Sequence, residues 1–361
     1  MAVATHHPPL ASPAPGSCAM RPRCCGHDAP AAAAAAVVVP SASTPPSSST
    51  CAGRDNTTGS LRSYKLLPKV GEGAFGVVRR ARHRRTGEEV AIKSVRRGSG
   101  EDLLREAALL AECAGNPAVV QLREVVRGGD DDDLHLVMEF VGPSLHDVTA
   151  ARRRAGIRFT ESEARRAMRR LLRGVEEMHA RGVVHCDLKP GNVLIGKEED
   201  GGRGRAIKIC DLGLARSAAS PPPETDTKNT HHHQLGGTLW YMAPEQLLGD
   251  GEVGAAVDVW ALGCVMAELV AGEPLFGQKD TVYEQVVKIV DVLGVPDEVS
   301  SLPLGVSAST AASRLREMVP EEKLSPAGFD VVRGLLEYEP KDRLTAAAAL
   351  RKPWFAMDDD D

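Results

Sequence analysis

One polar loop constrains this chain more than any other feature: the sequence HCDLKPGN at residues 185–192. A long helical pattern precedes it and a short apolar run, Val193–Ile195, follows it, so we expect a loop between a helix and a strand. Such a loop can present the carboxylate of Asp187 to a hydroxyl, the ammonium of Lys189 to a phosphate and the amide oxygen of Asn192 to a metal. These groups suit phosphoryl transfer, in which catalysis is mostly positioning and charge stabilisation.

Composition agrees with a folded soluble protein. The 361 residues are enough for two lobes, with 42% hydrophobic and 26% charged residues. The net charge of -5 gives no reason to expect nucleic acid or a membrane as a partner. The eight cysteines form no paired CxxC sets, so neither a zinc site nor a disulfide framework is indicated. No apolar run approaches the ~20 residues that span a bilayer.

Both ends of the chain differ from the middle. Residues 1–60 are rich in Ala, Pro and Ser and poor in acidic residues, which predicts a disordered tail. An organellar transit peptide is the alternative, because the segment is also acid-poor with Arg21 and Arg23. We otherwise expect the nucleus, the cytoplasm or both. At the other end, residues 356–361 predict a disordered acidic tail.

A glycine-rich motif, GEGAFGVV, occupies residues 71–78. Glycines allow a backbone to close over phosphates because they carry no Cβ. The same GxGxxG pattern marks dinucleotide-binding folds, but there it leads into a helix. Here the run Val77–Ala81, the turn Arg85–Glu88 and the run Val90–Lys93 follow. This order is strand, turn, strand, and it favours a glycine loop that caps a hairpin.

Lys93 ends an apolar strand, where an ammonium group needs a counter-ion. The helical pattern at 101–113 contains Glu106, which can pair with it. The alternative places Glu106 on a solvated helix face. Farther on, the run Ile207–Cys210 predicts a strand that ends in Asp211, a position suited to holding a metal.

Taken in order, these motifs resemble those of eukaryotic protein kinases over residues 64–355, since Ala243-Pro244-Glu245 completes the set. The resemblance implies a two-lobed α+β fold. Its N-lobe (64–140) would be a small antiparallel β-sheet with one helix, and its C-lobe (142–355) would be larger and mainly helical. It also implies transfer of the γ-phosphate of ATP to protein Ser or Thr hydroxyls, with ATP and Mg²⁺ as cofactors.

The same resemblance implies a role for each polar side chain. Asp187 would accept the proton of the substrate hydroxyl, and Lys189 would steady the γ-phosphate. Asn192 and Asp211 would hold Mg²⁺. The implied catalytic residues are Asp187, Lys189, Lys93 and Glu106, with Asp258 as the anchor of their loop and Glu245 paired with Arg343.

An ATP-binding set follows from the resemblance as well. Its members would cover the phosphates, enclose the adenine or supply backbone hydrogen bonds between the lobes, with Met138 as gatekeeper. They are Val70, Gly71, Glu72, Gly73, Ala74, Phe75, Gly76, Val77, Val78, Ala91, Lys93, Glu139, Val141 and Leu194.

Within the kinases, the chain resembles cyclin-dependent kinases, and among these the divergent plant F type. The resemblance rests on the glycine loop together with the sequences at 238–241, 272–276, 292–296 and 338–344. It suggests a role in the cell cycle or as a kinase of an RNA polymerase subunit.

Several positions depart from that family. Cys186 replaces an arginine that grips an activating phosphothreonine, and His233 stands where that threonine is expected. We therefore hypothesise that activation needs no phosphate at the usual site, with Thr227 or Thr230 as substitute acceptors. Met242 and the pair Gly236-Gly237 alter the pocket that selects proline after the target residue, so proline-directed specificity is an open question.

Two further departures concern regulation. Ala74 and Phe75 lack the hydroxyls that carry inhibitory phosphates in the family, and the segment 98–105 lacks its cyclin-recognition sequence. We therefore do not expect cyclin binding. A catalytically weak pseudokinase that serves as a scaffold is the alternative function. The five polar residues that the chemistry needs are all present, which favours an active enzyme.

Overall fold

The computed structural model describes residues 59–73, 76–95, 100–128, 133–198, 205–217, 238–249, 253–278, 281–295 and 313–357. Most of the predicted N-terminal tail therefore lies outside the described residues, as do the glycine-loop residues Ala74 and Phe75. The described elements reach beyond the predicted domain limits at both ends. Gly59–Ser60 forms a strand, and Ala356 belongs to a 3₁₀ turn that Trp354 anchors in the core.

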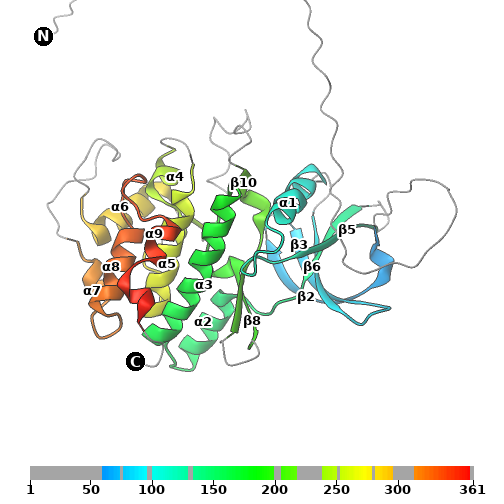
Figure 1. The fold of residues 1–361 in the computed structure, drawn as a ribbon, viewed down its shortest axis with the longest axis horizontal. Coiled ribbons are helices and arrows are strands. Elements are labelled where there is room, and N and C mark those ends of the chain that lie inside the picture. The colour runs from blue at the N-terminus through cyan, green and yellow to red at the C-terminus, as the bar shows by residue number, and fades with distance from the viewer. Residues whose placement is uncertain are drawn as a thin grey trace, which may run out of the picture. The chain divides into compact units, whose positions relative to one another are not determined.

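The N-lobe is built on a six-stranded sheet of order β1-β5-β6-β4-β3-β2 (Figure 1). Neighbouring strands are antiparallel, as expected, except that β1 runs parallel to β5. The strands are β1 (Gly59–Ser60), β2 (Tyr64–Gly73), β3 (Gly76–His83), β4 (Glu89–Ser94), β5 (Leu122–Gly128) and β6 (Asp133–Glu139).

Strand β4 shows why Lys93 reaches the site. Val90 and Ile92 are buried in the small core of the sheet. Because side chains alternate along a strand, Ala91 and Lys93 lie on the opposite face. Helix α1 (Gly100–Glu112) packs on the sheet and buries Glu106 together with Leu103, Ala107, Leu109 and Leu110, so Glu106 is not on a solvated face.

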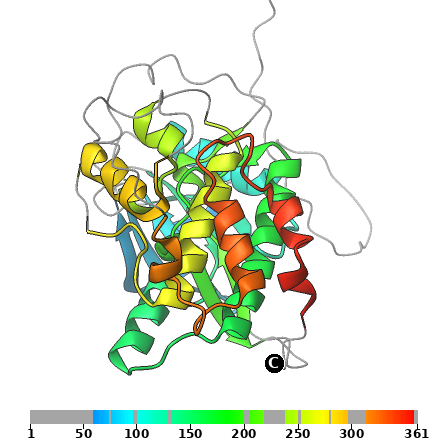
Figure 2. The ribbon, with the colours of Figure 1, turned by 90° about the vertical axis from the view of Figure 1, so that its left-hand side faces the viewer.

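The C-lobe is mainly helical (Figures 1 and 2). Its helices are α2 (Leu145–Arg154), α3 (Glu161–Ala180), α4 (Pro244–Leu248), α5 (Ala256–Ala271), α6 (Val282–Leu293), α7 (Leu315–Met318), α8 (Pro326–Leu335) and α9 (Ala346–Leu350). Its short strands are β7 (Val183–Val184), β8 (Val193–Glu198), β9 (Arg205–Ile209) and β10 (Arg216–Ser217). None of the described helices is both long and apolar enough to cross a bilayer.

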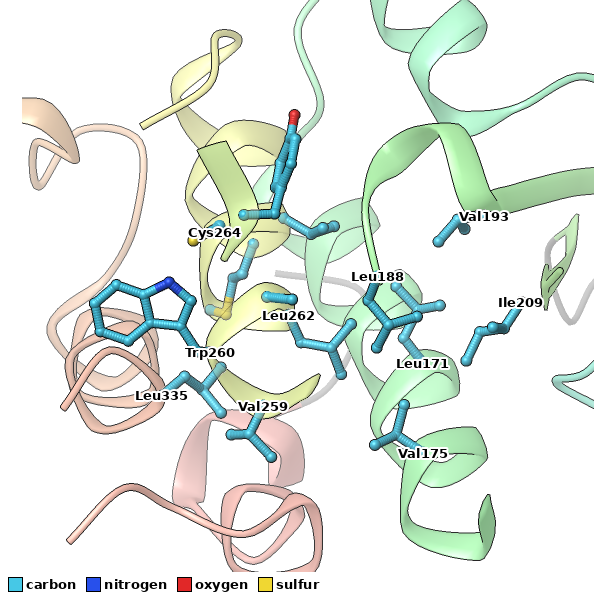
Figure 3. Close-up of a cluster of buried hydrophobic side chains, with 14 of the residues drawn as sticks. Leu171, Val175, Leu188, Val193, Ile209, Val259, Trp260, Leu262, Cys264 and Leu335 are labelled. Carbon is cyan, nitrogen blue, oxygen red and sulfur yellow. The ribbon is translucent and has the colours of Figure 1, made fainter. Parts of the chain in front are cut away.

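Helix α5 forms the centre of the C-lobe core. All of its residues after Ala256 are buried, including the acidic Asp258 and Glu268. Figure 3 shows Leu188, from the loop at 185–192, between Leu262 of α5 and Leu171 of α3. The polar loop is therefore anchored through an apolar side chain in the core.

Candidate active site

The loop at 185–192 is fixed by Asp258, as expected. Its Oδ2 accepts the backbone N–H of His185 at 2.8 Å, and its Oδ1 accepts that of Cys186 at 2.8 Å. His179 Nε2, at the end of α3, lies 2.9 Å from the same carboxylate. Leu188 is 2% exposed. Apolar burial and two hydrogen bonds to one buried carboxylate, which His179 also contacts, thus set the path of the loop.

The three polar side chains of the loop converge. Lys189 Nζ lies 2.8 Å from Asp187 Oδ2 and 3.1 Å from Oδ1. Asn192 Nδ2 donates to the backbone carbonyl of Asp187 at 2.8 Å and to its Oδ2 at 3.1 Å. The carboxylate of Asp187 is therefore oriented by two neighbours that its own loop supplies.

A second cluster forms around Lys93, where Asp211 joins the predicted pair of Lys93 and Glu106. Its Nζ lies 2.7 Å from Glu106 Oε2 and 2.7 Å from Asp211 Oδ1. The side chains of Lys93 and Glu106 are 6% and 3% exposed, whereas that of Asp211 is 34% exposed. Asp211 is thus the member of the cluster that a ligand can reach.

The protonation of this cluster follows from burial and charge. Burial alone would lower the pKa of Lys93, but the charges of Asp211 and Glu106 outweigh it and raise that pKa. Burial would raise the pKa of Asp211, yet Lys93 holds it below its ordinary value. Burial raises the pKa of Glu106 against the opposing charge of Lys93. Lys93 therefore stays an ammonium and Asp211 a carboxylate.

The predicted ATP-binding residues come from both lobes. Val70, Gly71, Glu72 and Gly73 lie in β2, Gly76, Val77 and Val78 in β3, Ala91 in β4, Met138 and Glu139 at the end of β6, and Leu194 in β8. Val141 follows β6 in the link between the lobes. Ile195 N–H donates to the carbonyl of Pro143 at 2.9 Å, which brings this link against β8.

The link carries a contact that the sequence did not indicate. Glu139 Oε1 accepts from the backbone N–H of Gln121 at 2.8 Å and lies 2.6 Å from Lys208 Nζ. The Glu139 N–H donates to the Gln121 carbonyl at 3.0 Å. The backbone and the side chain of Glu139 thus both tie the link to Gln121. Lys208 sits in an unremarkable apolar strand pattern, so no sequence signal pointed to it.

The motif Ala243-Pro244-Glu245, which we call the peptide platform, is held through Glu245 as expected. Arg343 Nη1 and Nη2 lie 2.7 Å and 3.0 Å from the two carboxylate oxygens of Glu245. Among the basic residues near the altered activation segment, Arg105 donates to the carbonyl of Gly213 at 3.3 Å. Burial raises the pKa of the Cys186 thiol well above its usual range. His233, Thr227, Thr230 and Gly236-Gly237 lie outside the described residues.

Comparison with known proteins agrees with this geometry. Residues 64–355 match the family model described as "Protein kinase domain". The chain is 47% identical to a putative cyclin-dependent kinase F-2 of Oryza sativa subsp. japonica, over 83% of this chain and 91% of the relative. It is 40% identical to cyclin-dependent kinase G-2 of Oryza sativa subsp. indica, over 82% of this chain but 42% of that relative.

A more distant relative also matches over most of its length. Cell division control protein 2 homolog 3 of Trypanosoma brucei brucei is 35% identical over 81% of this chain and 92% of its own length. Enzymes of this family use ATP and Mg²⁺ in general and act on protein substrates. The family match over most of the chain, together with these relatives, shows that the chain belongs to the protein kinase family and is a serine/threonine kinase of the cyclin-dependent-kinase-like type.

Proposed function

We propose that this kinase transfers the γ-phosphate of ATP with Asp187 as the group that orients the substrate hydroxyl and accepts its proton. The observation that carries the proposal is the paired arrangement of the two clusters. Asp187 is held by Lys189 and Asn192, and Lys93 is held by Glu106 and Asp211. These are the polar parts that phosphotransfer to a hydroxyl requires.

The donor set at Asn192 and Asp211 fits Mg²⁺. Mg²⁺ is commonly held by one or two carboxylates while water and substrate phosphates complete its octahedron. Asp211 offers a partly exposed carboxylate, and Asn192 donates through Nδ2 to Asp187, which leaves its Oδ1 as the amide acceptor. Among the described residues, no group of three or more His, Cys, Asp and Glu could hold a metal alone. When bound, the ion would neutralise phosphate charge.

The protein's own groups account for the remaining positioning. Lys93, kept charged by its two carboxylates, can bind the α- and β-phosphates. The ammonium group of Lys189 contacts the carboxylate of Asp187. A γ-phosphate that lies beside the substrate hydroxyl would therefore be close enough for Lys189 to bind it. The glycine-rich turn between β2 and β3 would cover the phosphates.

We further propose that the kinase needs no cyclin to form its ion pair. Lys93 and Glu106 are paired, and Arg181 on the C-lobe donates to the carbonyls of Glu112 and Ala114 at the end of α1 at 2.8 Å each. These contacts support an α1 position that is held from within the chain. Comparable specific activity of the purified chain with and without added cyclin would support this proposal, and a large activation would contradict it.

The direct test is ATP/Mg²⁺-dependent phosphorylation of a basic protein substrate. We expect the Asp187→Asn variant to lose about 10²–10⁴-fold in kcat, the range for removal of a general acid–base group, with ADP binding retained. The same change leaves the Lys93 cluster intact, so nucleotide binding serves as the folding control. Equal phosphotransfer by the two proteins would instead favour a scaffold without chemistry.

A further inference from the structure

A side chain of α4 joins the peptide-binding segment to the catalytic loop. Gln246 Oε1 accepts the backbone N–H of Ala243 at 3.1 Å, and its Nε2 donates to the backbone carbonyl of Cys186 at 3.3 Å. The side-chain amide of Gln246 has an acceptor oxygen and a donor nitrogen, so in one orientation it can bond the N–H of Ala243 and the carbonyl of Cys186 at the same time. The half-buried side chain of Gln246 therefore bridges the start of α4 and the catalytic loop. Its two partners, Cys186 and Ala243, are 57 positions apart in the sequence.

The residue it holds is the one immediately before Asp187. Cys186 has φ 65°, in the left-handed region that residues other than glycine rarely adopt. Its N–H is held by Asp258 of α5, and its carbonyl is held by Gln246 of α4. That carbonyl belongs to the peptide bond that leads into Asp187. Its orientation therefore helps to set the direction of the Asp187 backbone.

A small gap lies at this junction. Its volume is about 10 Å³, and Cys186, Met242, Gln246 and Val257 are among the residues that line it. This is close to the smallest volume that holds one water molecule. The hydrogen bond from Gln246 to Cys186 therefore lies beside the gap, since both residues line it.

We propose that Gln246 is a positioning residue for phosphotransfer. It ties the catalytic loop to the segment that carries the peptide substrate, so that Asp187 keeps its working direction without a phosphate group between the two segments. The inference rests on the proposed role of Asp187. It also differs from a simpler role for the same side chain, in which the contact with Ala243 only caps the start of α4.

Two variants separate these roles. Gln246→Met removes both hydrogen bonds at similar volume. Gln246→Glu keeps an acceptor for the Ala243 N–H, and Glu is favoured at this helix position, but its carboxylate cannot donate to Cys186. On phosphatase-treated enzyme we expect both variants to lower kcat for a peptide substrate about tenfold, equivalent to about 1.4 kcal/mol. The KM for ATP should not change, because the Lys93 cluster is untouched.

Leu248→Met, in the same helix, is the matched control and should retain the wild-type kcat. A Gln246→Glu variant with wild-type kcat would show that the side chain only caps α4, and would overturn the inference. A kcat loss accompanied by a higher KM for ATP and a lower unfolding midpoint would overturn it too, since general damage to the fold explains that pattern.

A readout that needs no turnover completes the design. We expect faster hydrogen exchange in the segment 184–190 of both Gln246 variants, because one hold on the Cys186 peptide is gone. Unchanged hydrogen exchange in this segment would contradict the proposed hold of Gln246 on the loop. If the wild type transfers no more phosphate than Asp187→Asn, the proposed function fails. If the wild type is active and both Gln246 variants have the same kcat as the wild type, only the positioning role of Gln246 is wrong.

Discussion

Two active-site residues hold a costly backbone conformation. In the described part of the chain, Cys186 and Asp211 are two of three residues other than glycine with positive φ, at 65° and 66°. For an L-residue this conformation costs roughly 1–2 kcal/mol. Asp258 holds the first through its N–H, and Lys93 holds the second through its carboxylate. The strain therefore lies beside the groups that the chemistry uses, and it is balanced by a hydrogen bond to the buried Asp258 and by the ion pair of Asp211 with Lys93.

Glu268 is a single buried carboxyl group that should make the stability of the fold depend on pH. It is 5% exposed, and burial raises its pKa although the hydrogen bond from Tyr241 Oη at 2.6 Å opposes the shift. A carboxyl whose pKa is raised by folding contributes stability below its unfolded pKa of about 4.3, and that contribution is lost as pH rises through the folded pKa. Wild-type stability should thus fall over this window.

The Glu268→Gln variant should remove this loss, because the amide oxygen can still accept from Tyr241. We expect its free energy of unfolding, relative to wild type, to increase between about pH 5 and about pH 8 in urea titrations. A variant that is destabilised equally at all pH values would show that the neutral amide fits the site poorly, and would contradict the prediction.

At the scale of elements, helix α3 shows how local signals set a long helix. Thr160 Oγ1 accepts the N–H of Glu163 at 3.1 Å, and Glu163 Oε2 accepts the N–H of Thr160 at 2.9 Å. These two hydrogen bonds form a capping box, and the apolar residues of the helix behind it are buried. The helix starts at its cap and leads to the catalytic loop.

Replacing Thr160 tests whether its capping hydrogen bond stabilises the start of α3. Thr160→Ala should lower the free energy of unfolding by about 0.5–2 kcal/mol, because the orphan N–H groups of the first turn lose their acceptor. Thr160→Ser, which keeps the hydroxyl, is the matched control and should stay near wild type in the same urea titration. Phosphotransfer by both variants should be unchanged, since the cap lies at the far end of α3 from the loop. Equal stability of the Ala and Ser variants would contradict the prediction.

Helix α5 illustrates what element-level patterns miss. Its sequence is apolar nearly all round, which indicates burial but not which partner each face meets. Asp258 and Glu268 interrupt that pattern, and the structure gives each a distinct partner: the catalytic loop for Asp258 and Tyr241 for Glu268. The acidic residues therefore connect the core helix to the two functional segments.

At the scale of the whole molecule, the ion pair of Glu245 with Arg343 joins helix α4 to the loop before α9. The Arg343 side chain is 0% exposed, and it also donates to the carbonyls of Ala256 and Tyr338 at 2.9 Å and 3.0 Å. Its guanidinium carbon lies 5.1 Å from the ring centre of Trp260. With Glu245 removed, a buried charge would remain without a counter-ion.

Glu245→Ala should therefore cost about 3–5 kcal/mol in the free energy of unfolding. The double change Glu245→Ala with Arg343→Met should cost less than the sum of the two single changes, because it removes the stranded charge. A double-mutant cycle by urea unfolding measures this coupling. Strict additivity of the two changes would contradict the buried pair as the source of the loss.

Much of the site was predictable because its motifs are short and local. The loop at 185–192, the strand that ends in Lys93 and the Asp-Leu-Gly turn at 211–213 each combine side-chain chemistry with an element boundary that is visible in the sequence. The pairing of Lys93 with Glu106 was confirmed as a contact, although the sequence left a solvated Glu106 open. The choice depended on how α1 packs on the sheet.

By itself, the sequence determined the identity of the polar residues and, through its resemblance to protein kinases, the two-lobed α+β fold, because short motifs and hydrophobic periodicity are local properties. The tertiary structure alone decided which distant groups meet. The contacts of Lys208 with Glu139 and of Gln246 with Cys186 join segments 60 or more residues apart, since 208 − 139 = 69 and 246 − 186 = 60. Such contacts leave no periodic signal, because they depend on how packed helices and strands place separate backbones side by side.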